Sequence, residues 1–449
     1  MRPSYDLIVR GGRCVTPSGT LPADVGITAG RISALGSLSG AAAAEELGAR
    51  GLHVLPGIID SHVHFREPGF EHKEDLASGS RGALLGGVTA VVEMPNTDPP
   101  TTTEAALRDK RERAHGRAFC HVGFYVGATP GNADALGELE RSPGCAGIKL
   151  FMGRSTGGLL VDAEGDVRRV LRAAARRVAV HAEDEARLVE RSPLRGSDPA
   201  RHPLWRDAES ARLATERVLR LARETGCRIH LLHVTTAEEL ELLARHRDLA
   251  SVEVTPQHLL LEAPDCYARL GTRAQINPPI REASHARALW RGLLAGTVDT
   301  VASDHAPHTL EEKAQPYPDS PSGMPGVQTL VPLMLDAVNR GRIRLERAVE
   351  LCSAAPARIL GIPGKGRLEV GADADLTLVD LAHSRVLEDG WIASRCAWTP
   401  FAGRRLRGWP RVTVLGGCVV ARDGEVVGPP SGKLLAFANA SLTRGDAAT

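Results

Sequence analysis

The apolar run His53-Val54-Leu55-Pro56-Gly57-Ile58-Ile59 leads directly into Asp60-Ser61-His62-Val63-His64. A short apolar run that ends in polar residues is typical of a strand buried on both faces, as in a parallel sheet. Side chains two apart on a strand point to the same face, so the two imidazoles can hold one metal ion. An isolated H-x-H pattern also fits two surface histidines, and the rest of the chain has to decide between these interpretations.

Further apolar, β-branched runs follow, and segments with helical periodicity separate them. The runs are Val88 to Met94, His121 to Gly127, Gly147 to Phe151, Val178 to Ala182, Arg228 to Val234, Ser251 to Val254 and Val298 to Ala302. The helical segments include Glu104 to His115, Val167 to Arg176, Ala208 to Glu224, Ala237 to Arg245 and Ser284 to Leu294. Buried strands that alternate with helices in this way predict an α/β fold, a closed (β/α)8 TIM barrel, with its chemistry at the ends of the strands.

Short β-patterned segments with Gly-rich turns flank the barrel region on both sides. Tyr5 to Gly12 and Asp24 to Ile27 precede it, and Asp375 to Asp380 and Val412 to Gly417 follow it. We expect these segments to pair into one small β-sandwich domain that is discontinuous in sequence. The predicted boundaries are 1–54 and 366–449 for this domain and 55–365 for the barrel.

Three more polar side chains stand at the predicted ends of barrel strands. His181 ends the run from Val178, His233 ends the run from Arg228, and Asp304 follows the run that begins at Val298. Each alone fits a hydrogen-bonded polar residue at a strand end. Together with the H-x-H pair they predict a metal centre, because the strand ends of a barrel meet at one face.

Other histidines have weaker patterns. His230 is out of phase with His233, so we expect it to face the helices. His202 has no partner pattern, and we expect a surface or packing role for it.

Lys149 lies in the run from Gly147 to Phe151, where a free ammonium would point into a dry barrel mouth at a high cost. The lysine either extends to solvent, or its neutral amine reacts with CO2 to form a carbamate. A carbamate is a carboxylate on a long arm and can bridge two cations, which would acidify a shared water near neutral pH. We therefore expect two divalent ions and, among zinc, manganese, iron and cobalt, we expect zinc. The predicted ligands are His62, His64, Lys149, His181, His233 and Asp304.

Composition excludes several classes of protein. The chain has 449 residues, a formal net charge of +1 and 24% charged residues of both signs interspersed, so no basic stripe is available for nucleic acid. The segment from Met1 to Arg10 lacks the pattern of a secretory signal, and no apolar run approaches the roughly 20 residues of a membrane span. The eight cysteines are scattered without a metal or disulfide framework. We expect a cytoplasmic enzyme with a small-molecule substrate and no nucleic-acid or membrane partner.

The H-x-H pair, the strand-four lysine, the two later histidines and the strand-eight aspartate resemble the pattern of the amidohydrolase superfamily, in its cyclic amidase branch. Within that branch the sequence resembles dihydroorotases, because His62-Val63-His64-Phe65-Arg66-Glu67-Pro68-Gly69 matches their H-x-H-x-R-x-P-G motif. Further matches are His72 to Asp75, Met94 to Thr97, Ile276 to Arg281 and Asp304 to His308. The opening Tyr5 to Gly12 and the segment Gly371 to Leu376 are also similar to this branch.

The resemblance implies reversible hydrolysis of (S)-dihydroorotate to N-carbamoyl-L-aspartate, a step of de novo pyrimidine biosynthesis. It implies that a hydroxide shared by two metal ions attacks the ring amide and that Asp304 shuttles the proton. The resemblance also assigns the substrate contacts: Arg66, Asn96 and His308 to the carboxylate, and Asn277, Ser322 and Gly323 to the ring. The segment from Phe151 to Gly157 resembles the dihydroorotases in which a carboxylated lysine, here Lys149, bridges the metals. Asp162 is the alternative bridge if Lys149 is unmodified.

Gln257 and Gln328 depart from the family pattern, which has a histidine and a glutamate at these positions. Allantoinase and dihydropyrimidinase or hydantoinase are the nearest alternative activities, since they share the metal ligands. A catalytically silent subunit that supports a transcarbamoylase is an alternative of another class, but such a subunit should have lost ligands. We expect a homo-oligomer, and association with an aspartate transcarbamoylase remains open.

Overall fold

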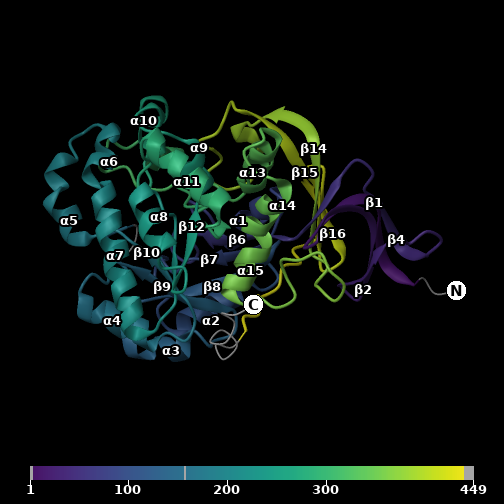
Figure 1. Cartoon of the computed structure of the whole chain (residues 1–449), viewed down its shortest axis with the longest axis horizontal. Coiled ribbons are helices and arrows are strands. Elements are labelled where there is room, and N and C mark those ends of the chain that lie inside the picture. Colours follow the sequence, from purple (N-terminus) through teal and green to yellow (C-terminus); the bar gives the residue numbers. More distant parts are fainter. Residues whose placement is uncertain (1–3, 156–157, 439–449) are drawn as a thin grey trace.

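The computed structural model describes residues 4–155 and 158–438, and a parallel barrel forms its larger part (Figure 1). The barrel strands are β6 (Ile58–Val63), β7 (Val88–Glu93), β8 (His121–Gly127), β9 (Cys145–Phe151), β10 (Val178–His181), β11 (Ile229–Leu231), β12 (Ala250–Val254) and β13 (Thr300–Val301). Within the described residues these eight strands are hydrogen bonded in sequence order from β6 to β13. A parallel bridge between Val63 and His305 brings the two edges together, and the amide of His64 donates to the His305 carbonyl at 2.7 Å. The predicted (β/α)8 fold is confirmed.

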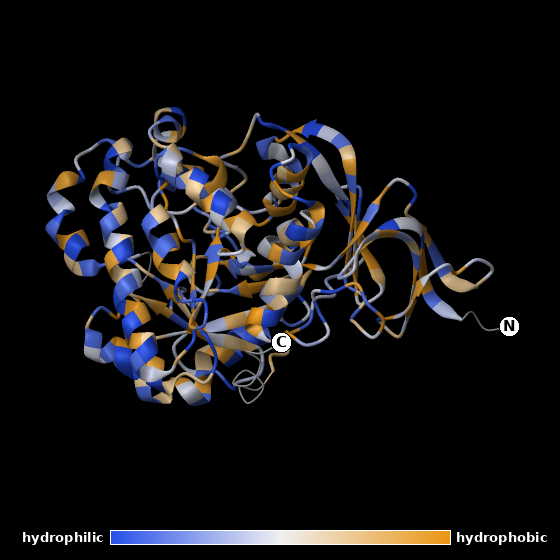
Figure 2. Cartoon of the chain, viewed as in Figure 1, coloured by the Kyte–Doolittle hydropathy of each residue, from blue (hydrophilic) through white to orange (hydrophobic). Residues whose placement is uncertain are grey.

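Helices cover the outside of the barrel, and hydrophobic and hydrophilic residues alternate along them (Figure 2). Their buried apolar residues pack in one cluster with those of the barrel strands. The local sequence explains their ends. In α7 (Ala208–Thr225), Asp207 caps the first turn by accepting from the Ser210 amide, and Gly226 ends the helix at a φ of 69°. The other helices of the barrel region are α1 (Leu76–Leu85), α2 (Glu104–Ala114), α3 (Leu136–Leu139), α4 (Glu164–Ala173), α5 (Glu185–Glu190), α6 (His202–Trp205), α8 (Ala237–Ala244), α9 (Pro256–Leu260), α10 (Asp265–Leu270), α11 (Ala283–Ala295), α12 (Leu310–Lys313), α13 (Leu330–Asn339), α14 (Leu345–Val349) and α15 (Ala355–Leu360).

The segments before and after the barrel form a second, mixed sheet, drawn in purple and yellow in Figure 1. Its strands are β1 (Tyr5–Thr16), β2 (Gly19–Thr28), β3 (Arg31–Gly36), β4 (Ala43–Gly48), β5 (His53–Pro56), β14 (Leu376–Val386), β15 (Arg405–Leu415), β16 (Cys418–Arg422) and β17 (Glu425–Val426). In the described part of the chain the order is β17-β16-β15-β14-β5-β1-β2-β3, with β4 beside β1. The expected discontinuous β unit is therefore present. Residues 1–3 and 439–449 of its predicted extent lie outside the described residues.

The first apolar run, which the sequence predicts as one strand, is divided at Gly57. β5 pairs with β1 and β14 in the second sheet, whereas β6 begins the barrel. A Cβ on Gly57 would lie 2.4 Å from Oγ1 of Thr89, and the Gly57 amide donates to the Asp375 carbonyl at 2.7 Å. Only glycine fits at the point where the chain leaves the second sheet and enters the barrel. This point, Gly57, lies three residues after the predicted boundary at residue 54.

Loops that follow the barrel strands pack against the C-terminal segment. One apolar cluster joins Tyr267 and Ile276, from the segment between β12 and α11, to Trp398, which precedes β15, and Trp409, which lies in β15. Between β10 and α7 the chain adds α5 and α6, which lie at the edge of the barrel in Figure 1. The loops after the strands and the segment with α5 and α6 together surround the C-terminal ends of the barrel strands.

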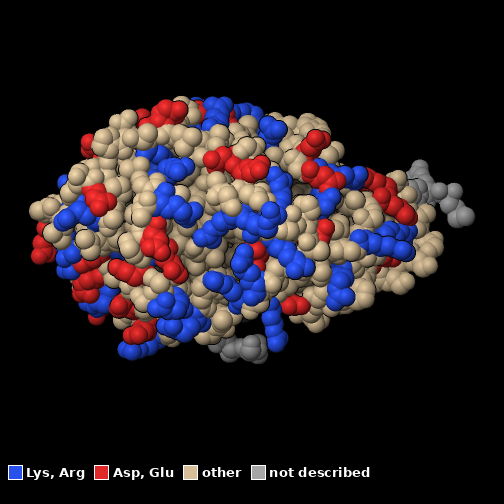
Figure 3. All heavy atoms as spheres, turned by 90° about the horizontal axis from the view of Figure 1, so that it is seen from above, with Lys and Arg blue, Asp and Glu red and all other residues tan. Residues whose placement is uncertain are grey.

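Lys, Arg, Asp and Glu are interspersed over the face seen in Figure 3. Many of them form networks, such as Arg168 and Arg220 with Glu164 and Glu224. None of the helices in residues 4–155 and 158–438 is long and apolar enough to cross a membrane.

Candidate metal centre and substrate pocket

A pocket of about 370 Å³ lies among the residues at the C-terminal ends of the barrel strands. Every site residue predicted from the sequence except His308 contributes to its wall. The wall is formed by His62, His64, Arg66, Asn96, Lys149, Phe151, Ser155, His181, His233, Ile276, Asn277, Asp304, Ala306, Ser322 and Gly323. The barrel thus brings together residues that are far apart in the sequence.

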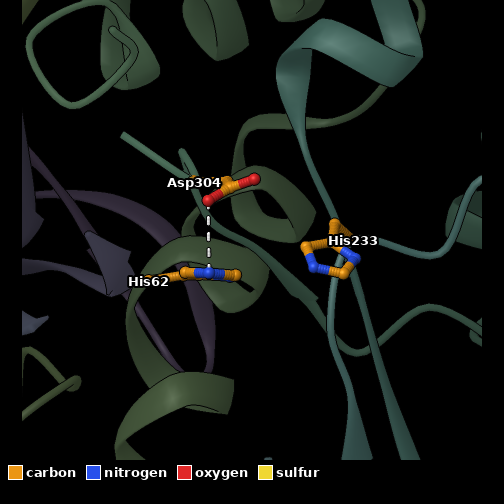
Figure 4. A group of neighbouring side chains, drawn as sticks. All are labelled: His62, His233 and Asp304. Atoms are coloured by element: carbon orange, nitrogen blue, oxygen red, sulfur yellow. Dashed lines mark ion pairs between the residues drawn. The ribbon is translucent and has the colours of Figure 1, made fainter. Parts of the chain in front are cut away.

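His62 and His64 face the carboxylate of Asp304. The Nε2 atoms of His62 and His64 lie 3.2 Å and 3.1 Å from Oδ1 of Asp304. His233 joins this group, since its ring and the His62 and Asp304 side chains place one ligand atom each within 4.8 Å of one another (Figure 4). Burial would raise the pKa of Asp304, but the neighbouring imidazoles lower it to about 2, so the carboxylate is ionised at neutral pH.

The outer nitrogens of these histidines are held by hydrogen-bond acceptors. Nδ1 of His62 lies 2.8 Å from Oε1 of Glu253, and Nδ1 of His64 lies 2.7 Å from Oδ1 of Asn96. Each Nδ1 therefore carries a proton, and in the neutral ring each Nε2 has a lone pair that can bind a cation placed between it and Asp304. Burial lowers the pKa of His64 to about 3, which favours this neutral form.

His181 follows the same pattern on the other side of the pocket. Its Nε2 lies 2.8 Å from Oε2 of Glu183, so its Nδ1 turns a lone pair toward Nε2 of His233 at 3.0 Å. Nδ1 of His233 is buried and has no hydrogen-bond partner in the described residues. Imidazoles that are held by an acceptor at one nitrogen, as His62, His64 and His181 are, and turn the other nitrogen toward a common point are typical of metal ligands. A cation among the converging nitrogens and the Asp304 oxygen would give these atoms a shared partner.

Lys149 adds an unsatisfied amine to this group. Its side chain is fully buried, and Nζ has no hydrogen-bond partner in the described residues. Its Nζ lies 4.5 Å from the centroid of the Phe151 ring. Burial lowers the pKa of Lys149 to about 7, so much of the amine is neutral at physiological pH. A neutral, desolvated amine fits carboxylation, and the donor set as a whole fits divalent metal ions. Asp162 is exposed and does not line the pocket.

Glu253 and Glu183 are functional residues that sequence reasoning missed. Glu253 lies on β12 and also accepts from Ser61, and Glu183 is held by Arg206 in a buried ion pair. The sequence does carry a signal for Glu253, because a charged residue inside the apolar run from Ser251 to Val254 indicates a buried carboxylate with a specific partner.

The expectation that His230 faces the helices is wrong. Its ring contacts Ser251 and Glu253 on the neighbouring strand, with Nδ1 2.8 Å from Oγ of Ser251. The alternation of side chains was counted back from His233, but His233 has a φ of 37°, in the left-handed region. This turn breaks the alternation of the strand, so the parity taken from His233 gives the wrong face.

Backbone conformation is unusual at three pocket residues. Arg66, His233 and Asp304 have φ values of 63°, 37° and 42°, where residues other than glycine are uncommon. Such strain is often found at functional sites, because the surrounding structure must hold it in place.

Arg66 and His308 lie together at one edge of the pocket. Nε of Arg66 donates to the Pro307 carbonyl at 3.2 Å, and its Nη2 lies 3.3 Å from Nε2 of His308. His308 itself is fully buried behind Arg66 and Gly323 and is not part of the wall. A Cβ on Gly323 would lie 2.4 Å from the Ala306 carbonyl, so glycine is required for this loop to pass close to the strand end.

Gln257 and Gln328, the two positions that depart from the dihydroorotase pattern, lie outside the pocket wall. Gln257 donates to the Ser303 carbonyl, and Gln328 bonds to the backbone of Trp391 and Ala393. Both hold loops in place. Thr156 and Gly157 of the segment after Lys149 lie outside the described residues.

Comparison with known proteins identifies relatives over nearly the whole chain. The model of the amidohydrolase family matches residues 53–420. A dihydroorotase from Halobacterium salinarum is 41% identical over 382 residues, 85% of this chain and 89% of that protein. An allantoinase from Rubrobacter xylanophilus is 38% identical over 449 residues, 96% of this chain and 98% of that protein. The solved structure of an L-hydantoinase (dihydropyrimidinase) from Arthrobacter aurescens has a TM-score of 0.92 at 31% identity, over 96% of this chain and 99% of that one. These relatives bear different names, so a choice among their activities rests on the pocket itself.

Proposed function

The chain belongs to the amidohydrolase family and is a hydrolase of cyclic amides, and from this premise we propose that it is a dihydroorotase. It interconverts (S)-dihydroorotate and N-carbamoyl-L-aspartate. The Halobacterium salinarum relative supports this choice.

The environment of Arg66 carries the proposal. The side chain is 2% exposed and lines the pocket, and in residues 4–155 and 158–438 no carboxylate forms an ion pair with it. Burial lowers the pKa of Arg66 only to about 10, so the guanidinium stays charged at neutral pH. A buried charge without an ion-pair partner is costly, and a carboxylate on the substrate is the bidentate partner that a guanidinium fits best.

The alternative substrates fit this environment less well. Dihydrouracil, hydantoin and allantoin carry no carboxylate, so each would leave Arg66 without an anion. Dihydroorotate supplies a carboxylate beside the scissile ring amide. The charge of the pocket edge therefore favours dihydroorotate.

In the proposed reaction the side chains of the pocket have three roles: metal binding, substrate binding and proton transfer. His62, His64, His181, His233, Asp304 and a carboxylated Lys149 would hold two divalent ions, for which we propose zinc. When bound, such ions supply Lewis acidity and make water acidic enough to react at neutral pH. Arg66 holds the substrate carboxylate, and the Asp304 carboxylate takes a proton from the attacking water and delivers it to the departing ring nitrogen.

A substrate panel tests the proposal. Purified protein of known metal content is assayed with dihydroorotate, allantoin, hydantoin and dihydrouracil. We expect the highest kcat/KM with dihydroorotate. A higher kcat/KM with any uncharged ring would replace dihydroorotase by the corresponding activity, and activity on none of them would favour a silent subunit.

A further inference from the structure

His202 lies directly behind Asn277, the pocket residue assigned to the substrate ring. His202 belongs to α6, in the segment between β10 and α7, and its side chain is fully buried. Its Nε2 lies 3.0 Å from the Ile276 carbonyl and 3.0 Å from Oδ1 of Asn277. Its Nδ1 lies 3.3 Å from the hydroxyl of Tyr317.

These contacts fix the tautomer of His202. The Ile276 carbonyl can only accept a hydrogen bond, so Nε2 of His202 carries the proton. Burial lowers the pKa of His202 to about 3, which keeps the ring neutral. Nδ1 is then an acceptor, and the Tyr317 hydroxyl donates to it.

The tautomer in turn fixes the orientation of Asn277. A protonated Nε2 cannot face the NH2 group of an amide, so the Asn277 oxygen must be the atom beside His202. The Asn277 nitrogen points away from His202, and it has no hydrogen-bond acceptor in the described residues. Because Asn277 lines the pocket, this nitrogen is available as a donor to a bound molecule.

The ring of His202 is held in place on two sides. Trp205 and Tyr317 contact it edge to face, with centroid distances of 5.7 Å in both cases. Trp205 is itself fixed, since its Nε1 donates to the Leu188 carbonyl at 2.8 Å. The imidazole therefore cannot turn over to offer its other nitrogen without breaking this packing.

We propose that His202 is a positioning residue that locks the side-chain amide of Asn277 with its N–H groups toward the pocket. The site then presents a hydrogen-bond donor to a carbonyl oxygen of the substrate ring and disfavours a ring with an N–H at that point. The proposal rests on the assignment of this pocket as the site of cyclic amide hydrolysis. It assigns a function to the segment between β10 and α7, which contributes no side chain to the pocket wall and otherwise reaches the site only through Glu183, which holds His181.

A double-mutant cycle tests the proposal in the metal-loaded enzyme. His202→Met removes the donor, and His202→Gln keeps one at similar length. With Asn277 intact, we expect His202→Met to raise KM about tenfold with little change in kcat, the effect of one hydrogen bond that is similar in ground and transition states. His202→Gln should recover most of that loss. In the Asn277→Ala background, His202→Met should have no further effect on KM, because His202 acts through Asn277.

An equal rise in KM with and without Asn277, or no rise at all, would overturn the proposal. His383→Met, at an exposed histidine on β14, is the control for the substitution itself. If His202→Met does not fold, His202→Phe keeps the contacts with Trp205 and Tyr317, lacks the donor, and completes the same cycle. The cycle is run on the substrate with the highest kcat/KM of the panel, so a failure of the dihydroorotase assignment leaves this test decisive.

Discussion

The guanidinium of Arg66 lies against the imidazole of His308, with 3.3 Å between Nη2 and Nε2. Nε2 of His308 is also 3.1 Å from the Ser322 carbonyl, and its Nδ1 is 3.3 Å from Nζ of Lys73. With Nε2 protonated, His308 donates to the Ser322 carbonyl and its Nδ1 accepts from Lys73. Nε2 then cannot accept from Arg66, so the two side chains are in packing contact only. His308 therefore holds the Ser322 loop and packs behind Arg66, and in the proposed function Arg66 is the group that binds the substrate carboxylate.

Arg66→Met should lower kcat/KM for dihydroorotate by about 30- to 1000-fold, because a charge-assisted bidentate contact is worth roughly 2–4 kcal/mol. Metal content should stay unchanged, and any activity on dihydrouracil should hardly change. Steady-state kinetics and elemental analysis measure both effects. Arg154→Met removes an exposed arginine outside the pocket wall as a matched control. Equal losses on both substrates would argue against carboxylate recognition by Arg66.

Lys149→Ala should abolish tight binding of one of the two expected ions, because the bridging ligand is lost. Short carboxylic acids should restore part of the activity by occupying the place of the carbamate. Elemental analysis and activity with added acetate or propionate test this. Full activity of the unsupplemented variant would show that another group bridges the ions.

Asp304→Ala should lower kcat far more than it changes the affinity for substrate, because the proposed proton transfer matters mainly in the transition state. Proton transfer by a positioned group contributes about 100- to 10,000-fold in rate. Comparison of kcat with substrate affinity from equilibrium binding separates the two effects. Near-normal turnover would remove Asp304 from the mechanism.

Glu253→Gln should weaken metal binding by about 10- to 100-fold, because Glu253 holds the tautomer and orientation of His62. Metal affinity is measured by competition with a chelator. Glu140→Gln is the matched control, since Glu140 is also buried but accepts from the backbone amides of Ala175 and Arg176. A similar loss of metal affinity in both variants would point to a general loss of structure.

Lys313 should make stability depend on pH. Its ammonium is fully buried and donates to the carbonyls of Gln275 and Pro321, and burial lowers its pKa to about 7. The unfolded chain keeps the proton up to about pH 10, so between about pH 7 and 10 the unfolded state binds more protons and stability rises with pH. We expect Lys313→Met to lack this rise, which is at most about 1.4 kcal/mol per pH unit. Urea unfolding of both proteins across this pH range measures it, and parallel curves would contradict the prediction.

Much of this site could be predicted, because residues at the C-terminal ends of successive barrel strands lie close together in space even when they are far apart in the sequence. His62, His181 and Asp304 lie at or just after the end of an apolar run and Lys149 lies near the end of one, and the ends of parallel strands meet at one face of a barrel. The parity rule failed for His230, because a left-handed residue at His233 interrupted the strand.

The role of His202 could not be predicted from the sequence. Its contact with Asn277 depends on how the segment between β10 and α7 packs against the loop that follows β12. No local sequence pattern predicts this contact, because it depends on the tertiary packing of two irregular segments. The same holds for Asn96, whose oxygen accepts from His64, whereas the family motif suggested only a substrate contact.

The pairing of β5 with β14 has a consequence for synthesis on the ribosome. Pro56 and Leu376 are partners in the second sheet, so β5 stays without that neighbour until the whole barrel has been translated. At about 5–20 residues per second, this interval is on the order of half a minute. During it the nascent chain exposes an open strand edge next to the barrel that is forming, and an unpaired edge can recruit a foreign strand. We therefore expect chaperones to bind the N-terminal strands until β14 has been translated.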